Sequence, residues 1–487
     1  MAVIINKEEL RDKILACWTG KNIGGTMGAP YEGSIEIQDI KGYVTKPGSA
    51  LPNDDLDLQL VWLKALEEQG PHKLTPAVLS DYWVKCIPPM WNEYGTAKAN
   101  IKTGMIPPIS GELDNERWKN SNGAWIRSEI WACLAPGYPN LACKYAFMDA
   151  CVDHGYSEGT IAEIFTASME SYAFFENDLR KLIDISLEKI PETSRVYKSI
   201  KIVMDAYDSG KDWITARKLV VDDSADLGWF QAPANVAFVI LGLLYGEGDF
   251  KKSMITAINC GDDTDCTGAT IGAIMGIMSG TAGIPQDWAE YIGDSIVTVA
   301  TSNGVGEKVY PKTCTELTDR VMRLIPTMFV AHNSDFEFTD GETDCADKGG
   351  VSKLPEPRTY FREKKYSYMG YDGINEKCYI EYDGEPNVAP NSEVHLSVVF
   401  ENKNYEPRQL HVQIYTPDGW TAEYSKRVFL IHNMADSVHH YLKDSHITTL
   451  DVIIRTNENV RDINRCAVEV TADGRANVEF APIVLLG

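Results

Sequence analysis

The chain has 487 residues, a formal net charge of −24 and a pI near 4.8. This length exceeds what one ordinary core fills, so we expect two or more domains. The acidic balance argues against nucleic acid and anionic membranes as main partners, and it suits a protein that attracts cations or that needs charge only for solubility.

The start of the chain and the pattern of its cysteines both predict a cytoplasmic protein. The first residues lack the basic start and long apolar run of a signal peptide. No stretch approaches the apolar length of a membrane span. The eleven cysteines are scattered without framework spacing, which predicts reduced, buried thiols.

The first predicted helix begins at Asn6, which forms a capping-box pattern with Glu9. A glycine-rich stretch, residues 20–28, continues the helix and suggests close packing against a neighbour. Pro30 should end the helix near residue 29. Glu32 therefore falls on a loop that leaves a tightly packed helix, and taken alone it would be a solvated surface acid.

An acidic segment, Asn53-Asp54-Asp55-Leu56-Asp57, comes next and precedes the apolar stripe of a second helix. One interpretation is helix capping together with a favourable helix dipole. The other is that its carboxylates, placed at a helix terminus, help to bind a cation together with another acidic segment. The segment by itself leaves both open.

The middle of the chain is predicted to be mostly helical over residues 75–95 and 125–235. Between these ranges lies a loop region rich in Gly, Pro and Asn, residues 103–123, of a kind that often carries binding groups. His154 ends another predicted helix. It could either interact with the C-terminus of this helix or contact the substrate.

A second acidic segment, residues 259–268, precedes a helix with glycines every fourth residue from 268 to 280. Those glycines share one helix face, which again predicts close packing. One Asp can cap the helix, but Asp262, Asp263 and Asp265 exceed that need, and crowded carboxylates repel unless a cation neutralises them. Oxygen ligands suit Mg²⁺, Ca²⁺ or Mn²⁺, and the flanking cysteines lack zinc spacing.

The last part of the chain changes from helical to alternating apolar periodicity. We therefore expect an all-α domain over residues 1–330, a polar linker over 331–357 and an antiparallel β-sandwich over 358–487. The β region carries no acid pair or metal-ligand spacing, so it suits an accessory role in packing, oligomerisation or ligand contact.

Four segments together resemble the ADP-ribosylglycohydrolase family, of the dinitrogenase reductase-activating glycohydrolase type. They occur in the family's order, within a region of similarity over residues 8–330: Gly24–Glu32, Asn53–Asp55, Asn122–Arg127 and Gly261–Cys266. The resemblance implies a compact all-α domain of orthogonal helices with two Mg²⁺ ions, or Mn²⁺ in their place, at the bottom of a cleft. It also implies hydrolysis of the bond between ADP-ribose and a protein side chain or another group.

The resemblance assigns roles to individual acids. Asp54 and Asp55 would be metal ligands from the first acidic segment, and Asp263 and Asp265 would be ligands from the second. Glu32 would be the general base or water-positioning group at the scissile bond, and Asp55 would share in catalysis as a carboxylate beside the developing positive charge on the sugar.

The same resemblance implies that the Asn122-Gly123-Ala124 turn offers backbone N–H groups to phosphate and that His154 lines the ligand cleft. Two ligand positions depart from the family's pattern. Asn53 stands where the first metal-binding segment usually has Thr, and Cys266 stands where the second usually has Thr. An amide oxygen can still bind Mg²⁺, whereas a thiol is a poor Mg²⁺ ligand, so a neighbouring hydroxyl or water would have to replace it.

Three functions follow from these residues. The first is Mg²⁺-dependent cleavage of an N- or O-glycosidic bond to ribose in an ADP-ribosylated substrate. The second is hydrolysis of another riboside or small glycoside on the same scaffold, which the changed positions 53 and 266 favour. The third is a non-catalytic relative that binds a nucleotide, against which the retained acids argue.

Overall fold

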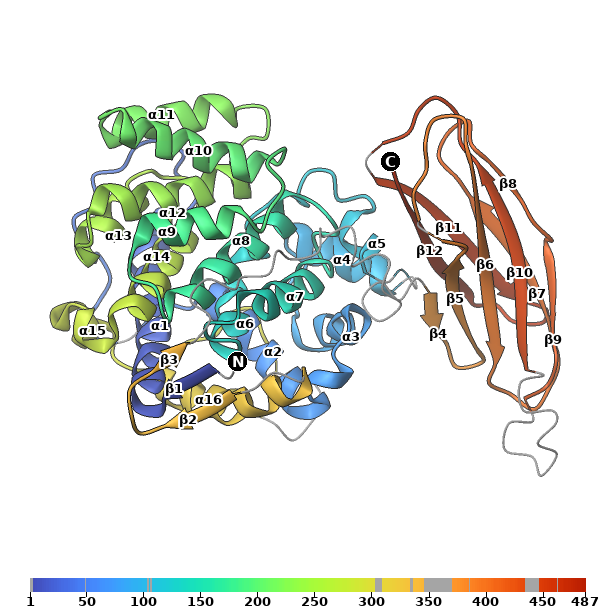
Figure 1. The fold of residues 1–487 in the computed structure, drawn as a ribbon, viewed down its shortest axis with the longest axis horizontal. Helices are drawn as coiled ribbons and strands as arrows, with labels where there is room; N and C mark the ends of the chain where they lie inside the picture. Colours follow the sequence, from blue (N-terminus) through green and yellow to red (C-terminus); the bar gives the residue numbers. More distant parts are fainter. Residues whose placement is uncertain are drawn as a thin grey trace.

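The computed structural model describes residues 3–48, 50–102, 105, 107–302, 309–332, 336–345, 370–384, 386–433, 446–461 and 463–487. Figure 1 shows a body of helices beside a body of strands, in the chain order expected from the sequence. The predicted combination of a helical region followed by antiparallel β structure is confirmed. Part of the predicted linker, residues 346–357, lies outside the described residues.

Helices fill the region from residue 7 to residue 331. Their bounds are α1 Lys7–Gly28, α2 Asp54–Gln69, α3 Pro76–Cys86, α4 Asn92–Lys102, α5 Ile109–Glu112, α6 Glu129–Leu134, α7 Pro139–Ala150, α8 Glu158–Ala173, α9 Leu179–Leu187, α10 Arg195–Asp208, α11 Trp213–Asp223, α12 Ala232–Gly246, α13 Phe250–Ile258, α14 Thr264–Ser279, α15 Gln286–Ile292 and α16 Cys314–Ala331. Short 3₁₀ turns add η1 Ala29–Tyr31, η2 Pro71–Lys73, η3 Trp125–Arg127 and η4 Thr281–Gly283.

Helix α1 begins and ends where the local sequence predicts. The side-chain oxygen of Asn6 accepts a hydrogen bond from the backbone N–H of Glu9 at 2.9 Å, which caps the first turn. The helix ends at Gly28, and Pro30 lies in the following 3₁₀ turn because its ring cannot continue the α-helical hydrogen bonds. The 22 residues between these points bury most of their last three turns.

Helices α1 and α14 cross with their backbones in direct contact, as their glycine spacing predicts. A methyl group added at Gly20 would lie 2.0 Å from the carbonyl oxygen of Gly272, and one added at Gly24 would lie 2.0 Å from that of Gly268. One added at Gly28 would meet the carbonyl oxygen of Thr264 at 2.2 Å. The contacted residue numbers on α14 decrease as the residue numbers on α1 increase, so the two helices run antiparallel.

The strands that the structure describes form three sheets. Their bounds are β1 Val3–Asn6, β2 Phe336–Thr339, β3 Asp344–Cys345, β4 Gly370–Asp372, β5 Glu376–Tyr382, β6 Glu393–Asn402, β7 Arg408–Tyr415, β8 Thr421–Glu423, β9 Arg427–Leu430, β10 Ile447–Arg455, β11 Ile463–Ala472 and β12 Val478–Leu486. The C-terminal strands form two antiparallel sheets, in the orders β4-β5-β6-β10-β8 and β12-β11-β7-β9. Alternate residues of β6 and β10 are buried, as their sequence pattern predicts, while the face-to-face sandwich stays a prediction.

Strands β2 and β3, within the stretch predicted as a linker, pair with the start of the chain. Strand β2 pairs in parallel with β1, with Val3 opposite Phe336 and Asn6 opposite Thr339. Strand β3 pairs with the other edge of β1. The end of the helical region is therefore held to its beginning by backbone hydrogen bonds.

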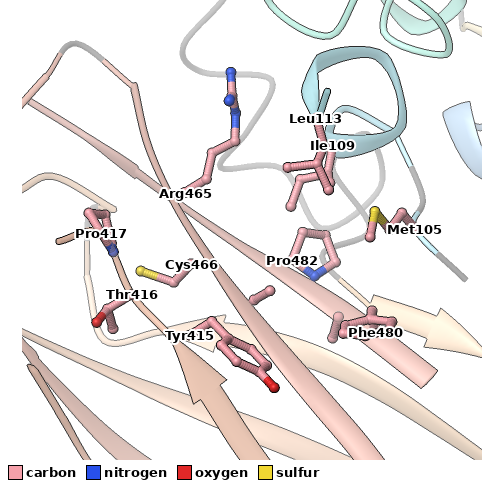
Figure 2. Close-up of a pocket in the computed structure, with 12 residues that line it drawn as sticks. Met105, Ile109, Leu113, Tyr415, Thr416, Pro417, Arg465, Cys466, Phe480 and Pro482 are labelled. Carbon is pink, nitrogen blue, oxygen red and sulfur yellow. The ribbon is translucent and has the colours of Figure 1, made fainter. Parts of the chain in front are cut away.

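The strand-rich region meets the helical region at α5. Arg465 of β11 forms an ion pair with Glu112, the last residue of α5. Beside this pair lies a cavity of about 240 Å³ between Ile109 and Leu113 on the helical side and Phe480 on the strand side (Figure 2). The contact between the two regions therefore combines one buried acid with an apolar surface.

The ten cysteines whose side chains the structure describes are all buried and form no disulfide, as predicted for reduced thiols. Within the described ranges, no helix is both long enough and apolar enough to cross a membrane.

Candidate metal centre and active site

The crossing of α1 and α14 determines where the acidic residues meet. The hydroxyl of Thr264, at the first turn of α14, donates a 2.8 Å hydrogen bond to the carbonyl oxygen of Gly28, the last residue of α1. The end of α1 is thereby held against the start of α14. Glu32 comes directly after η1, the 3₁₀ turn that follows α1. Asp263 precedes α14 and Asp265 lies in its first turn. All three acids therefore lie near the contact between the end of α1 and the start of α14.

Two groups of side chains there lie close enough to hold a cation. Carboxylate oxygens of Glu32, Asp263 and Asp265 lie within 4.8 Å of one another. Ligand atoms of Asp55, Asp265 and Cys266 do the same. Asp265 belongs to both groups, so the two positions are adjacent. We call this pair of groups the acidic centre.

The acidic centre contains buried carboxylate oxygens without hydrogen-bond partners among the described residues. They are Oδ2 of Asp55, Oδ1 of Asp263 and Oδ1 of Asp265, on side chains that are at most 5% exposed. A buried carboxylate without a partner is strongly disfavoured unless a cation or proton neutralises it. Oxygen ligands at this density suit a hard divalent cation, so the acidic centre could bind a metal ion.

The electrostatics of the acidic centre favour protonation when no cation is present. Desolvation, followed by the negative charges of Asp265 and Asp54, raises the pKa of Glu32 to about 8, although part of its side chain remains exposed. Burial, with a further contribution from Asp265, raises the pKa of Asp54 to about 6. Burial and the Asp265 charge also raise the pKa of Asp263 well above its usual range. A divalent cation would therefore displace protons as it binds.

Mg²⁺ should stabilise the protein more at pH 8 than at pH 6. Without a cation, the folded state holds protons on Glu32 and Asp54 that the unfolded state has already lost, so stability falls as pH rises toward 8. Bound Mg²⁺ reverses this because it favours the ionised carboxylates. Thermal unfolding with EDTA or with saturating Mg²⁺ at both pH values measures the effect. An equal or larger Mg²⁺ gain at pH 6 would contradict it.

The residues of the first acidic segment have different roles: Asn53 caps a helix, whereas Asp55 belongs to the acidic centre. Asn53 caps α2, because its Oδ1 accepts from the backbone N–H of Asp55 at 2.7 Å. Asp54 accepts a 2.9 Å hydrogen bond from the hydroxyl of Tyr94 and belongs to neither cation group. Asp57 lies apart, where it accepts from the N–H groups of the loop at residues 299–300. Metal ligation by Asn53 and Asp54 stays a prediction.

Asn122 contacts the acidic centre directly. Its Nδ2 donates to Oδ2 of Asp263 at 2.7 Å. The residue after it, Gly123, has no room for a side chain, because an added methyl group would lie 2.2 Å from Oε1 of Glu93. The Asn122-Gly123-Ala124 turn is therefore packed tightly beside Asp263. The proposed contact of its N–H groups with phosphate stays a prediction.

His154 is completely buried in a polar cluster next to this turn. Its Nε2 lies 3.2 Å from the hydroxyl of Ser121, and its Nδ1 lies 3.0 Å from Oδ1 of Asp153. Asp153 also accepts two hydrogen bonds from Arg127. His154, Asp153 and Glu93 form a third group whose ligand atoms lie within 4.8 Å, but the Arg127 guanidinium already supplies a cation there.

Lys21, which no sequence motif singles out, and Asp262, expected to cap α14 or to support the metal ligands, both lie outside the two cation groups. Lys21 is 1% exposed and donates to Oε1 of Glu129 at 2.7 Å, while its ammonium lies 3.9 Å from Oδ2 of Asp55. In the sequence, the sign of this role is the position of Lys21 within the glycine-rich stretch of α1. Asp262 adopts φ +69°, and its Oδ1 accepts from the N–H of Phe230 at 2.7 Å, which places it outside both cation groups.

The fold and site together define a helical protein with a buried acidic centre suited to divalent cations. A family model described as ADP-ribosylglycohydrolase matches residues 6–329. The chain belongs to the ADP-ribosylglycohydrolase family, and members of that family are glycosylhydrolases, which makes this protein a glycosidase-type enzyme. The match ends where the helical region ends, so it does not extend to the strand-rich region.

Comparisons with individual proteins give weaker similarities. An ADP-ribosylglycohydrolase-related protein complex of known structure is 17% identical, with a TM-score of 0.44, and the match covers 66% of this chain and 99% of that chain. A FixG-related protein from Vibrio parahaemolyticus is 8% identical, with a TM-score of 0.19, and the match covers 23% of this chain and 97% of that chain. The comparison with curated proteins gives no match.

Proposed function

We propose that this enzyme hydrolyses an N- or O-glycosidic bond to ribose in an ADP-ribosylated substrate, with Mg²⁺ as its cofactor. The observation that carries the proposal is the convergence of three buried, unpartnered carboxylate oxygens, from Asp55, Asp263 and Asp265, beside the partly exposed Glu32. Family membership supports the reaction class.

The residues present fit a pair of divalent cations. Glu32, Asp263 and Asp265 would hold one cation, and Asp55, Asp265 and Cys266 would hold a second one beside it. At the oxygen-only group of Glu32, Asp263 and Asp265, bound Mg²⁺, or Mn²⁺ in its place, would supply Lewis-acid chemistry toward ribose hydroxyls and a water molecule. Asn53 and Asp54, at the start of α2, are the further ligands that we propose at the edge of the acidic centre.

Glu32 is the proposed general base. It is the one acid of its cation group that keeps substantial solvent exposure, so a water molecule and a substrate can both reach its carboxylate. An ionised carboxylate there can orient a water molecule and accept its proton at an oxygen of Glu32. Glycosidic bond breaking builds positive charge on the sugar, and the negative charge of Asp55 would stabilise it.

The substrate's phosphates would meet the Asn122-Gly123-Ala124 turn. The hydrogen bond from Asn122 to Asp263 ties the position of this turn to the acidic centre. Movement of one would therefore disturb the other, which suits a turn that aligns the ribose with Glu32. His154, whose Nε2 lies 3.2 Å from the hydroxyl of Ser121, is fully buried next to this turn and would support the wall of the ligand cleft.

A substrate panel tests this function. We expect Mg²⁺-dependent release of ADP-ribose from ADP-ribosylated protein or peptide, and little release of sugar from simple nucleosides and small glycosides. The opposite preference would favour the second candidate, hydrolysis of another riboside, which the Asn53 and Cys266 positions keep open. A non-catalytic relative would bind nucleotide in calorimetry and hydrolyse none of the panel.

We also propose that the chain divides into a glycohydrolase domain, residues 1–330, and an accessory β domain, residues 358–487. The end of the family match at residue 329 supports the first boundary. The β domain would serve packing, ligand contact or oligomerisation. Sedimentation of the full chain and of a chain ending at residue 345 would show whether the β domain changes the oligomeric state.

A further inference from the structure

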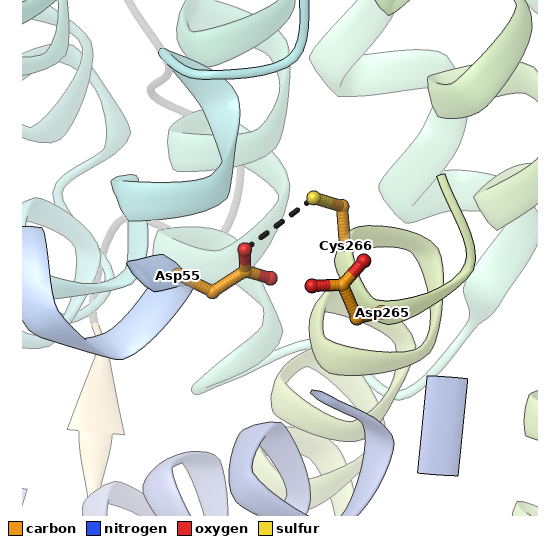
Figure 3. A group of neighbouring side chains, drawn as sticks. All are labelled: Asp55, Asp265 and Cys266. Carbon is orange, nitrogen blue, oxygen red and sulfur yellow. Dashed lines mark hydrogen bonds between the residues drawn. The ribbon is translucent and has the colours of Figure 1, made fainter. Parts of the chain in front are cut away.

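Cys266 sits in the first turn of α14, where it faces a carboxylate. It is 5% exposed, and its Sγ donates to Oδ1 of Asp55 at 3.3 Å. Figure 3 shows the thiol and the carboxylates of Asp55 and Asp265 pointing toward a common point between the start of α2 and the start of α14. Ligand atoms of all three lie within 4.8 Å. These three side chains could therefore hold a cation together.

Two carboxylate oxygens of this site lack hydrogen-bond partners among the described residues. They are Oδ2 of Asp55 and Oδ1 of Asp265, both on buried side chains. The nearest ammonium, on Lys21, lies 3.9 Å from the Asp55 oxygen and donates instead to Glu129 at 2.7 Å. The site thus presents unpartnered anionic oxygens that the protein's own cation only partly compensates.

The donor set differs in kind between the two halves of the acidic centre. Glu32, Asp263 and Asp265 present oxygen alone, which suits Mg²⁺. Asp55, Asp265 and Cys266 present two oxygens and one sulfur. Sulfur ligands favour zinc and similar transition ions over Mg²⁺, and three protein ligands with a free fourth position are typical of catalytic zinc sites.

We propose that the Asp55–Asp265–Cys266 position binds a sulfur-tolerant divalent ion, such as Zn²⁺ or Co²⁺, while the neighbouring oxygen-only position takes Mg²⁺. The proposal deepens the proposed function and rests on it only for the identity of the acidic centre. On binding, the Cys266 S–H bond breaks, the sulfur's electron pair forms the bond to the metal ion, and the proton leaves to solvent.

Cobalt spectroscopy of the full chain tests the proposal. After EDTA treatment, titration with Co²⁺ should produce a thiolate-to-cobalt charge-transfer band in the near ultraviolet. The band should be absent in Cys266→Ser and Cys266→Thr, and calorimetry should show Zn²⁺ affinity at least about tenfold lower in both, with Mg²⁺ affinity kept. Circular dichroism of each variant confirms that it folds.

Cys260 provides the matched control. It is fully buried in the same acidic segment, but its Sγ donates to the carbonyl oxygen of Thr256 at 3.4 Å and not to a carboxylate. Cys260→Ser should keep both the band and the Zn²⁺ affinity of the unaltered chain. Loss of the band in this variant, with the band retained in Cys266→Ser, would overturn the proposal.

The remaining outcomes separate this proposal from the proposed function. Co²⁺ binding without a charge-transfer band, or no Co²⁺ binding at all, overturns the sulfur-ligand proposal even if Mg²⁺ alone supports ADP-ribose release. A band that depends on Cys266 supports it even if no ADP-ribosylated substrate is hydrolysed, in which case only the proposed function fails.

Discussion

Asp263→Asn should lower turnover by orders of magnitude while the fold stays intact. The substitution keeps the size of the side chain, so packing around this fully buried position is preserved. It removes the charge from the unpartnered Oδ1, which is the oxygen available to a cation, and it weakens acceptance of the 2.7 Å hydrogen bond from Asn122. The same change should abolish the Mg²⁺ gain in thermal stability.

Glu32→Gln should have a comparable effect on rate for a different reason. An amide cannot accept a proton from water, so loss of a general base is expected to slow hydrolysis by about 10²–10⁴-fold. Initial rates of ADP-ribose release measure both substitutions, and circular dichroism checks their folding. Glu36→Gln, an exposed acid on the same loop, is the control that should retain activity. Turnover close to that of the unaltered chain in either Asp263→Asn or Glu32→Gln would refute its assigned role.

The second large effect is expected on stability, at the crossing of α1 and α14. In Gly272→Ala, the new methyl group would lie 2.0 Å from the carbonyl oxygen of Gly20, which is backbone and cannot move aside without separating the helices. Overpacking of this kind usually costs about 1–3 kcal/mol, and a contact between two backbones should exceed that range. We expect a loss above about 4 kcal/mol, or failure to fold.

Gly42→Ala provides the comparison for that substitution. Among the described residues, no heavy atom lies within 4 Å of the added methyl group at Gly42. Its effect on the free energy of unfolding should stay within about 0.5 kcal/mol, as for most surface substitutions. Thermal and urea unfolding of the full chain measure both variants. Equal stability of Gly272→Ala and Gly42→Ala would show that the helix crossing is looser than described.

Features that depend on near neighbours in the chain were predictable. The cap at Asn6 and the end of α1 before Pro30 follow from local backbone chemistry. Glycine spacing on α14 predicted a backbone contact, because glycine inside a helix is unfavourable without one. The alternation of β6 likewise predicted which of its residues are buried.

Features that depend on distant partners were not predictable in this way. Strand β2 joins β1 across more than 300 residues, and no local pattern in a polar segment specifies that pairing. The ion pair of Lys21 with Glu129 joins residues 108 positions apart, and a lysine inside a glycine-rich helix face does not by itself indicate its partner. The role of Asn53 could not be predicted because the same side-chain oxygen suits both helix capping and metal ligation. In the structure this oxygen caps α2.

A crystal structure with Mg²⁺ and ADP-ribose tests the central claim most directly. We expect a metal ion bound by Asp263 and Asp265, with hydroxyls of the ribose at that ion and the anomeric carbon facing Glu32. ADP-ribose bound away from the acidic centre, or metal ions bound elsewhere with these carboxylates left unpartnered, would contradict it.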